Sequence, residues 1–297
     1  MEVAIGIDLG CTHIKALLVN TEGGIVKQTR VDTIEHDDRH WKQAIKKIIE
    51  DWKREYKPGA IGLSAPGLAN ESNTCIQFMP GRLPGLENFN WSEFTGERVY
   101  VLNDAHAALM AEARFGAAKN LRHAMMLTLG TGVGGGILID GKLYQGVGQM
   151  AGHLGHVTVD ALDPVKDVTN MPGSLENAIG NLTIGLRSHG KFETTWEVVQ
   201  RYEAGDPVAT EIWLTSVRKL AVAVASFINI ISPEVVIIGG GISKAEELLL
   251  KPLRQFLSEY EWQPGGKQTP IRLAQFSDLA GALGAAGFAL SKINQRL

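Results

Sequence analysis

Residues 127–136 read L-T-L-G-T-G-V-G-G-G, and the expected fold is arranged around this glycine-rich turn. Glycine has no Cβ and tolerates positive φ, so the five glycines between Gly130 and Gly136 can turn several backbone N–H groups toward one phosphate. A glycine-rich hairpin without a ligand is the alternative interpretation. Apolar residues follow, and then Asp140-Gly141, a two-residue hairpin turn. The glycines therefore lie between two strands and do not open a helix, which argues against a Walker P-loop and a Rossmann fingerprint.

The composition is that of a soluble globular protein with one large or two ordinary domains. The chain has 297 residues, of which 44% are hydrophobic and 21% are charged. The net charge of -3 argues against nucleic acid as the main partner. Cys11 and Cys75 are too few for a disulfide framework or a cysteine-rich zinc site, so we expect a reducing, cytoplasmic setting. The stretch nearest to a membrane span, 208–231, is interrupted by charged residues, so we expect no membrane partner.

Hydrophobic periodicity and turn residues predict an α/β fold of two domains around a cleft. Strand, glycine turn and helix follow one another in both halves of the chain. The irregular stretch 70–90 is expected to be a loop over the cleft. The last helix carries small residues on one side, including Gly284 and Gly287, which permit close approach of another element. We expect strands at 1–9, 14–19, 25–31, 60–64, 99–102, 234–238 and 271–275, and helices at 41–56, 105–115, 175–186, 195–203, 207–231, 243–260 and 280–293.

Five short motifs carry a resemblance to a known family. Together they resemble the ROK family of sugar kinases, within the actin-like ATPase superfamily and of the glucokinase or N-acetylmannosamine kinase kind. The resemblance covers essentially the whole chain. The motifs are D-L-G-C-T at 8–12, N-D-A at 103–105, L-G-T-G-V-G-G-G at 129–136, G-H-L-G-H at 152–156 and V-I-I-G-G-G at 236–241.

The resemblance implies an architecture and an assembly. We expect two ribonuclease H-like domains that flank a cleft, in a chain that forms a homodimer. The smaller, N-terminal domain is expected to contain residues 1–115 plus 280–297, and the larger, C-terminal domain residues 116–279.

The resemblance also implies an ATP-dependent kinase that uses Mg²⁺. Phosphoryl transfer needs phosphate cradles, a metal ion and a group that receives the hydroxyl proton. Asp8 is expected to act on Mg²⁺ through a water molecule. Cys11 stands where the family has a glycine, so its φ is expected to be negative. The residues implied in nucleotide binding are Asp8, Gly10 and Thr12 of the first phosphate motif, Thr131 and Gly132 of the second, and Gly240 and Gly241 of the adenosine motif.

Asp104 is the implied catalytic base for the sugar hydroxyl. An aspartate just after a strand can instead be only a helix N-cap. Asn103 is expected to hydrogen-bond sugar hydroxyls, with a turn-forming role as the alternative. Gly67, in the turn after strand 60–64, is also expected to contact the substrate. Arg82, at an asparagine position of the family, either reaches the substrate or is a solvated loop arginine.

The expected sugar site departs from the family pattern at His153. The family has a glutamate there, within G-E-x-G-H, and this chain keeps His156 at the second position. A histidine cannot accept two hydrogen bonds as a carboxylate does, so His153 is expected to change which sugar fits. The alternative is that His153 only packs against His156. Glu176 is retained and is implied to bind the sugar.

The zinc site of the family is not retained in this sequence. Asp167, Thr169 and Ser174 stand where the family has three thiolates, so we do not expect zinc. The two histidines of H-L-G-H lack further nitrogen or sulfur ligands, which favours plain hydrogen-bonding roles. The loop 161–173 is then expected to be held by packing and backbone hydrogen bonds.

Three functions compete at the level of sequence. An ATP-dependent kinase that phosphorylates a hexose or N-acetylhexosamine at its 6-hydroxyl fits Asp104 and both phosphate motifs. A sugar-responsive repressor, also found in the family, would carry a DNA-binding helix-turn-helix before the first strand, and nothing basic precedes that strand here. A sugar- or nucleotide-binding homologue with altered or lost catalysis is the alternative, because of His153 and the missing thiolates. The sequence does not name the sugar.

Overall fold

The computed structural model describes residues 2–294, which form two compact units. The first unit contains residues 2–120, 143–151 and 278–294, and the second contains residues 121–142 and 152–277. The segment 143–151 thus belongs to the first unit, whereas the division expected from the sequence placed it in the second domain. Its contacts explain this placement, because Gly148 N donates to Glu71 Oε1 (3.3 Å) and His106 Nε2 hydrogen-bonds Ala151 O (3.0 Å).

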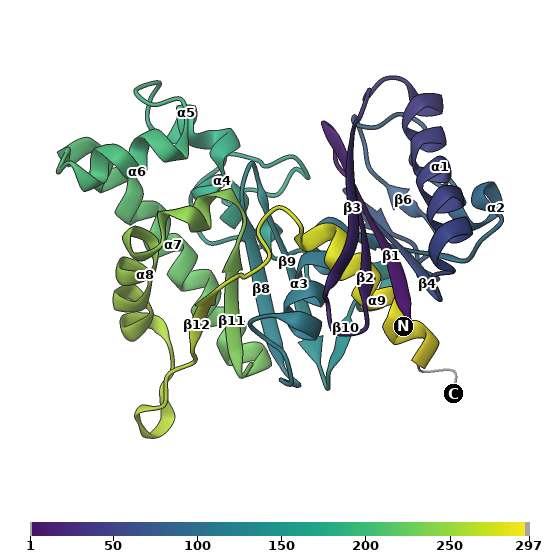
Figure 1. The fold of residues 1–297 in the computed structure, drawn as a ribbon. Helices are drawn as coiled ribbons and strands as arrows, with labels where there is room; N and C mark the ends of the chain where they lie inside the picture. The colour runs from purple at the N-terminus through teal and green to yellow at the C-terminus, as the bar shows by residue number, and fades with distance from the viewer. Residues whose placement is uncertain (1, 295–297) are drawn as a thin grey trace. The chain divides into compact units, whose positions relative to one another are not determined.

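The first unit is a five-stranded mixed sheet with helices on its faces (Figure 1). The strand order is β3-β2-β1-β4-β7. β1 pairs antiparallel with β2 and parallel with β4, and β7 extends the parallel side. The elements are β1 (Val3–Leu9), β2 (His13–Asn20), β3 (Ile25–Asp32), α1 (Asp38–Tyr56), β4 (Ala60–Ala65), β5 (Leu68–Ala69), β6 (Ile76–Phe78), α2 (Trp91–Thr95), β7 (Val99–Asn103), α3 (Asp104–Phe115), η1 (Val147–Gln149) and α9 (Ala280–Asn294).

The second unit repeats this topology. Its sheet order is β10-β9-β8-β11-β12, with β8 antiparallel to β9 and parallel to β11. In both sheets the third, second, first, fourth and fifth strands therefore lie in that order, which explains the echo between the two halves of the sequence. The elements are β8 (Ala124–Leu129), β9 (Val133–Ile139), β10 (Lys142–Tyr144, of which only Lys142 falls in this unit), η2 (Leu154–His156), α4 (Leu175–Ile179), η3 (Asn181–Thr183), α5 (Ile184–Arg187), α6 (Thr195–Glu203), α7 (Pro207–Ile231), β11 (Val235–Gly239), η4 (Gly241–Ala245), α8 (Glu247–Tyr260), η5 (Pro264–Gly266) and β12 (Ile271–Leu273).

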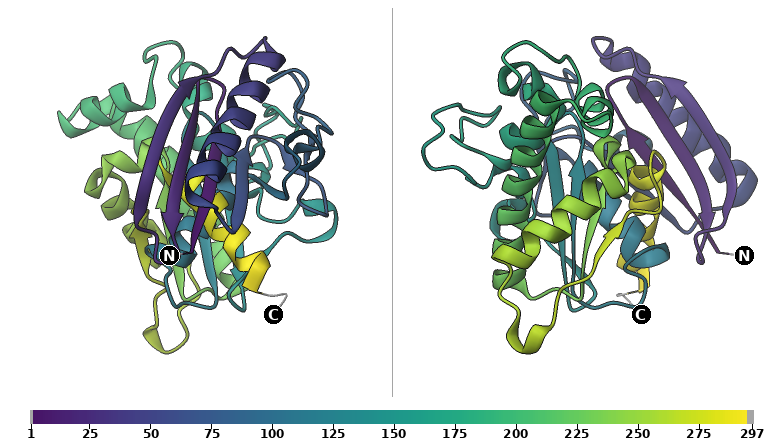
Figure 2. Two further views of the ribbon diagram at one scale, coloured as in Figure 1. Left: turned by 45° about the vertical axis from the view of Figure 1, so that its right-hand side comes forward. Right: turned by 90° about the vertical axis from the view of Figure 1, so that its left-hand side faces the viewer.

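In the first unit, α9 packs directly on the sheet because the strands present small residues to it. A Cβ added at Gly6 would overlap the backbone of Ala282, and one added at Gly62 would overlap the backbone of Ala285. Large residues alternate with these small ones and pack with α1 on the opposite face, where Trp41 is fully buried. Figure 2 shows α9, in yellow, running across the strands of this unit. The small residues of the last helix predicted a close approach, and Gly284 makes one to α3, because a Cβ there would overlap the backbone of Ala107.

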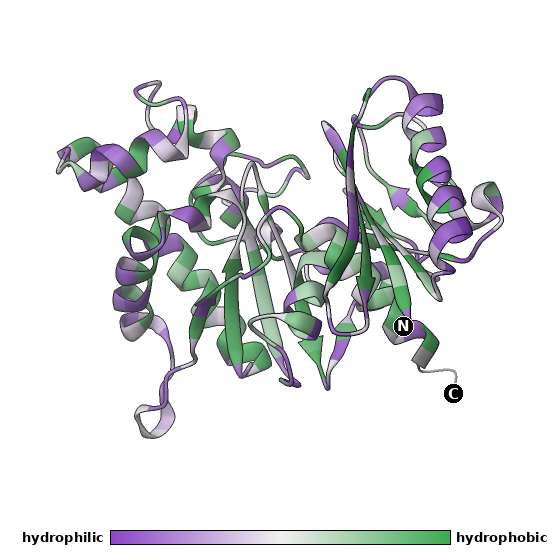
Figure 3. Cartoon of the chain, viewed as in Figure 1, coloured by the Kyte–Doolittle hydropathy of each residue, from purple (hydrophilic) through white to green (hydrophobic). Residues whose placement is uncertain are grey.

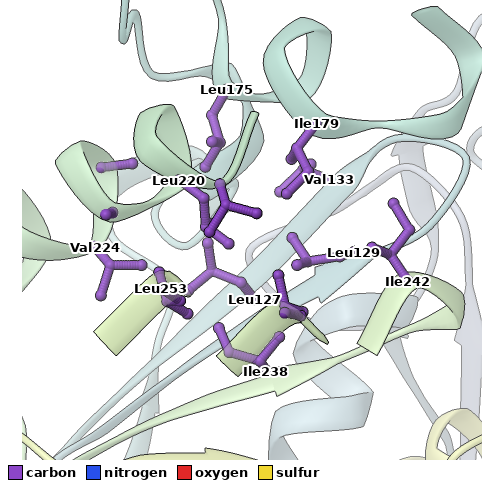
Figure 4. Close-up of a cluster of buried hydrophobic side chains, with 14 of the residues drawn as sticks. Leu127, Leu129, Val133, Leu175, Ile179, Leu220, Val224, Ile238, Ile242 and Leu253 are labelled. Atoms are coloured by element: carbon purple, nitrogen blue, oxygen red, sulfur yellow. The ribbon is translucent and has the colours of Figure 1, made fainter. Parts of the chain in front are cut away.

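In the second unit, the sheet packs against α7, α8 and α4. Leu127, Ile238, Leu220 and Leu253 are fully buried and point toward one another (Figure 4). Apolar residues gather on the strands and on the inner sides of the helices, and polar residues lie on the outer sides (Figure 3). α7 is long and apolar enough to pass a length-and-composition test for a membrane span, but half of its most apolar window is buried inside the protein. Its packing in the core accounts for its apolar character.

Two expected helices are interrupted. The expected helix 175–186 is wrong: α4 ends at Gly180, and the next N–H groups, those of Asn181 and Leu182, donate to Gly130 O and Thr131 O at 2.9 Å instead of continuing the helix. The expected helix 243–260 is also divided, because Glu246 has φ 47° and separates η4 from α8. At the first break the backbone N–H groups thus serve tertiary contacts with the glycine turn instead of the helix.

The role assigned to the glycines after Leu129 also differs from the expectation. The strand–turn–strand arrangement and the Asp140-Gly141 hairpin turn are confirmed, with φ values of 52° and 73° in that turn. None of the five glycines between Gly130 and Gly136, all within the described residues, has a positive φ. At Gly132 and Gly135 the lack of a Cβ instead makes room for neighbouring atoms.

We predict that Gly62→Ala destabilises the protein. The added methyl group meets the backbone of α9, which has no rotamer to move, so we expect a loss of about 1–3 kcal/mol in the free energy of unfolding. Denaturant unfolding followed by circular dichroism measures this loss. Gly185→Ala is the matched control, because a Cβ there meets no other atom within 4 Å and alanine favours the helix α5, so its stability should equal that of wild type or exceed it by up to about 1 kcal/mol. Equal midpoints for the two variants would contradict the packing argument.

Candidate active site

In the first unit, Asp8 lies near the end of the central strand β1, with polar neighbours on both adjacent strands. Ser64, its partner on β4, donates from Oγ to Asp8 Oδ1 at 2.8 Å. Lys15, its partner on β2, reaches Asp278, with Nζ 3.3 Å from Oδ2. A Cβ at Gly281 would overlap the Asp8 carboxylate, so the first turn of α9 lies against it. The carboxylate is thus enclosed by protein atoms and by one hydroxyl donor.

The electrostatics of Asp8 follow from this enclosure. Its pKa is raised from 3.8 to about 6: burial and, to a lesser degree, the Asp104 carboxylate raise it, while the Ser64 hydrogen bond and Lys15 lower it. An opposing positive charge would therefore stabilise the ionised form. Carboxylate and hydroxyl oxygens are the donor types that Mg²⁺ prefers, so the residues present fit this metal.

The turn after Asp8 is held by Thr33, which the sequence analysis did not single out. Gly10 N donates to His13 O (3.0 Å), Thr33 Oγ1 donates to Gly10 O (2.8 Å), and Thr33 N donates to Thr12 O (2.8 Å). Cys11 has no positive φ, as expected for a residue with a Cβ. Burial raises the pKa of the Cys11 thiol, so it is neutral. The first phosphate motif is therefore a braced turn.

Asp104 is the first residue of α3, and Asn103 is its N-cap. Asn103 Oδ1 accepts hydrogen bonds from the N–H groups of Ala105 (2.9 Å) and His106 (3.2 Å), and its Nδ2 donates to Gly67 O (2.9 Å). The alternative capping role thus belongs to Asn103 and not to Asp104. Asn103 is buried while Asp104 is exposed, so the cap fixes the helix start and leaves the Asp104 carboxylate accessible.

Desolvation by surrounding protein atoms raises the pKa of Asp104, although its side chain is accessible to solvent. The hydrogen bond from Ala105 N to Asp104 Oδ1 (2.8 Å) opposes this rise. A raised pKa makes a carboxylate a better proton acceptor.

Arg82 is paired with an acid in the first unit. Its Nε donates to Glu35 Oε1 at 3.1 Å, and its side chain remains half exposed. Leu83 has φ 47° and is buried, which anchors this loop. Arg82 is therefore neither unpaired nor buried, and no local sequence pattern predicts its neighbour Glu35.

In the second unit, Gly132 and Glu176 are brought together. Glu176 Oε2 accepts a hydrogen bond from Val133 N at 3.0 Å, and a Cβ at Gly132 would overlap that same oxygen. Thr131 lies between Gly130 and Gly132, whose N–H and C=O bond across the turn at 2.9 Å. The glycine turn and the glutamate of α4 thus form one packed group.

The expected adenosine motif follows β11. Gly240 has φ 85°, and a Cβ there would overlap the backbone of Leu129, so only glycine fits. At Gly241 a Cβ would meet open space. Ser243 Oγ donates to Gly240 O at 2.7 Å and stabilises the turn.

The two histidines of G-H-L-G-H flank η2. His153 is its N-cap, and His156 is its last residue. His156 Nδ1 lies 3.0 Å from Asp167 Oδ2, and one ligand-type atom from each of His156, Asp167 and Glu176 lies within 4.8 Å of the other two. The conformation of η2 thus places His156 beside Glu176.

Comparisons with known proteins identify the family. The model of the ROK family matches residues 4–292. This chain belongs to the ROK family. It is 31% identical to a glucokinase from Thermotoga maritima, over 97% of this chain and 98% of that protein.

Solved ROK structures share the fold. A ROK hexokinase from Thermus thermophilus is 29% identical and superposes with a TM-score of 0.86 over 99% of both chains. A ROK glucokinase from Streptomyces griseus, in complex with glucose and AMPPNP, is 25% identical with a TM-score of 0.78 over 97% of this chain and 99% of that one. The predicted α/β fold of the actin-like ATPase class is therefore confirmed.

The residues that the resemblance assigns to zinc in the ROK family do not fit that metal here. Ser174 Oγ accepts from Asn177 N and caps α4, so it serves the helix. Both carboxylate oxygens of Asp167 accept hydrogen bonds, which come from Thr169, Met171 and His156. These side chains therefore make hydrogen bonds within the protein, and none offers the thiolate that is typical of a structural zinc site.

We predict that Asp8 makes stability pH-dependent in metal-free buffer. The pKa of Asp8 is higher in the folded protein than in the unfolded chain, so its contribution is fully present below pH about 4 and is lost as pH rises through about 6. Asp8→Asn keeps an oxygen for the Ser64 hydroxyl but carries no charge. Between pH 4 and pH 8, wild type should therefore lose up to about 3 kcal/mol relative to the variant. Parallel unfolding curves at each pH measure this difference, and a constant difference would refute the assigned shift.

Proposed function

We propose that this ROK family member is an ATP-dependent sugar kinase that phosphorylates a hexose or N-acetylhexosamine at its 6-hydroxyl. The observation that carries the proposal is the placement of Asp104. Its carboxylate is accessible at the start of α3, is fixed by the Asn103 cap, and lies near enough to Asp8 to raise the pKa of that residue. A proton acceptor thus stands beside a site suited to a metal-bound phosphate. The Streptomyces griseus relative, solved with glucose and AMPPNP, supports both substrate classes.

The proposed reaction is a direct phosphoryl transfer. The sugar hydroxyl gives its proton to Asp104 as its oxygen forms a bond to the γ-phosphorus of ATP. The bond between that phosphorus and the β–γ bridging oxygen breaks, and ADP leaves with the electron pair. Mg²⁺, when bound beside Asp8, supplies positive charge that offsets the negative charge of the phosphates.

Each unit by itself contains residues that are proposed to bind substrate or nucleotide. In the first unit, the braced turn of Gly10 and Thr12 would receive phosphate, and Asn103 and Gly67 would hold the acceptor side. In the second unit, the expected nucleotide ligands are Thr131, Gly132, Gly240 and Gly241, and the expected sugar ligands are His153, His156 and Glu176. Arg82 is proposed to reach the substrate from its pair with Glu35.

The setting of the enzyme is also a proposal. Cys11 and Cys75 are both free, which is in keeping with a reducing cytoplasm. The homodimer implied by the resemblance stays a prediction.

A coupled assay of ADP release over hexoses, N-acetylhexosamines and polyols tests the function. The alternative, a homologue with altered or lost catalysis, would release no ADP in that assay, while calorimetry would still detect binding of sugar or ATP.

We predict that Asp104→Asn lowers the turnover number by about 10²–10⁴-fold. The substitution removes the proton acceptor, while the asparagine oxygen can still accept from Ala105 N, so the helix start should keep its structure. Steady-state kinetics with the best sugar measure the loss, and thermal unfolding checks that the fold is intact. Turnover close to the wild-type rate would show that Asp104 is not the base.

We predict that His153→Glu shifts the substrate profile toward glucose. A neutral imidazole offers one donor and one acceptor, whereas the family carboxylate accepts two hydrogen bonds near C1 and C2 of the sugar. Wild type should therefore prefer a sugar with an acceptor there, such as an N-acetyl carbonyl, because unpaired buried groups penalise the wrong analogue. Comparing kcat/KM over the same sugar panel tests this expectation, and an unchanged profile would remove His153 from the specificity argument.

A further inference from the structure

Asp167 is a buried carboxylate that the proposed reaction does not use. Its side chain has 0% of its surface exposed. Oδ1 accepts from Thr169 N (2.8 Å), Thr169 Oγ1 (2.7 Å) and Met171 N (3.0 Å), and Oδ2 faces His156 Nδ1 (3.0 Å). Although burial by itself raises the pKa of Asp167, the hydrogen bonds from Thr169, His156 and Met171 outweigh it and hold the pKa at about 2. Asp167 is therefore an ionised, acceptor-only centre.

The hydrogen bonds around Asp167 determine where His156 carries its proton. An ionised carboxylate cannot donate, so the 3.0 Å contact requires a proton on Nδ1. Thr169 Oγ1 lies 3.3 Å from the same nitrogen, and its only proton is already directed to Asp167 Oδ1. The hydroxyl must then accept from Nδ1 as well. Two independent acceptors thus select the Nδ1–H form of His156.

The other ring nitrogen is left for a ligand. The His156 side chain is 30% exposed, and within the described residues 2–294 no hydrogen bond joins Nε2 to the protein. When Nδ1 carries the proton of a neutral ring, Nε2 can only accept. Glu176, the neighbouring expected sugar ligand, is also an acceptor, and it is fixed by Val133 N.

We infer that Asp167 is a positioning residue that locks His156 as a hydrogen-bond acceptor for a sugar hydroxyl. It thereby takes the place of the zinc site implied by the ROK resemblance, since a carboxylate fixes imidazole orientation and tautomer through one hydrogen bond. The inference rests on the proposed function, in that the acceptor serves a sugar. The inference also explains how the segment Asp167–Ser174 keeps its shape. The Asp167 carboxylate accepts hydrogen bonds from the backbone N–H groups of Thr169 and Met171, and Ser174 is the N-cap of α4.

The test compares Asp167→Asn with a matched change in the same loop. In Asp167→Asn the amide oxygen can keep the backbone N–H groups, but the amide nitrogen cannot accept from Nδ1, so the ring should move its proton to Nε2. Asp163→Asn is the control, because the half-buried Asp163 carboxylate accepts from Val165 N, and within residues 2–294 no hydrogen bond joins it to His156. Nitrogen-15 NMR of the imidazoles reports the tautomer. The chain has eight histidines, so the His156 signal is assigned by its loss in His156→Gln.

We expect the Nδ1–H form in wild type and in Asp163→Asn, and the Nε2–H form in Asp167→Asn. The KM for the sugar should rise about tenfold in Asp167→Asn, as for the loss of one good hydrogen bond, while the KM for ATP stays within about twofold. A purely structural role of Asp167 would instead lower the folded, active fraction and leave both KM values unchanged.

Several results would overturn the inference. An Nε2–H form in wild type would do so even if Asp167→Asn failed to fold. An unchanged tautomer or an unchanged sugar KM in folded Asp167→Asn would also do so. One zinc ion per chain in elemental analysis of wild type would assign the positioning of His156 to metal instead. If wild type phosphorylates no sugar, the proposed function fails, while the tautomer measurement still decides whether Asp167 sets the state of His156.

Discussion

Backbone packs on backbone at the centre of the first unit, because Gly6 and Gly62 leave no side chain between the sheet and α9. This close approach brings Gly281, in the first turn of α9, against the Asp8 carboxylate. Water is thereby displaced from Asp8, and its pKa rises to about 6. A packing constraint inside the sheet is thus also what makes Asp8 favour a nearby positive charge. Enlarging any of these glycines would move the helix and the acid together.

In the second unit, glycines beside the turn 130–136 likewise allow neighbouring atoms to approach where a Cβ would not fit. Gly132 admits the Glu176 carboxylate, and Gly180 lets the end of α4 lie on the turn, where a Cβ would meet Thr131 O. The N–H groups that α4 gives up by ending there bond to the turn. The end of α4 at Gly180 and the conformation of the glycine-rich turn therefore stabilise each other through these hydrogen bonds.

The carboxylates of the two units are set to different tasks by their surroundings. Protein atoms with few donors surround Asp8 and lie beside the exposed Asp104, so desolvation raises the pKa values of both. Asp167 is buried too, but several donors surround it and its pKa falls to about 2. The first kind of environment suits a metal or a proton, and the second suits a permanent negative charge that orients other groups.

The sequence by itself determined the local features, including most strands and helices, the Asp140-Gly141 turn, and the position of Asp104 directly after a strand. These depend on periodicity and on turn chemistry within a few residues. The tertiary structure alone decided the pairs Ser64–Asp8, Glu35–Arg82 and His156–Asp167, and the break at Gly180. Such partners are distant in the chain, and their meeting depends on strand register and close packing, which no local pattern encodes.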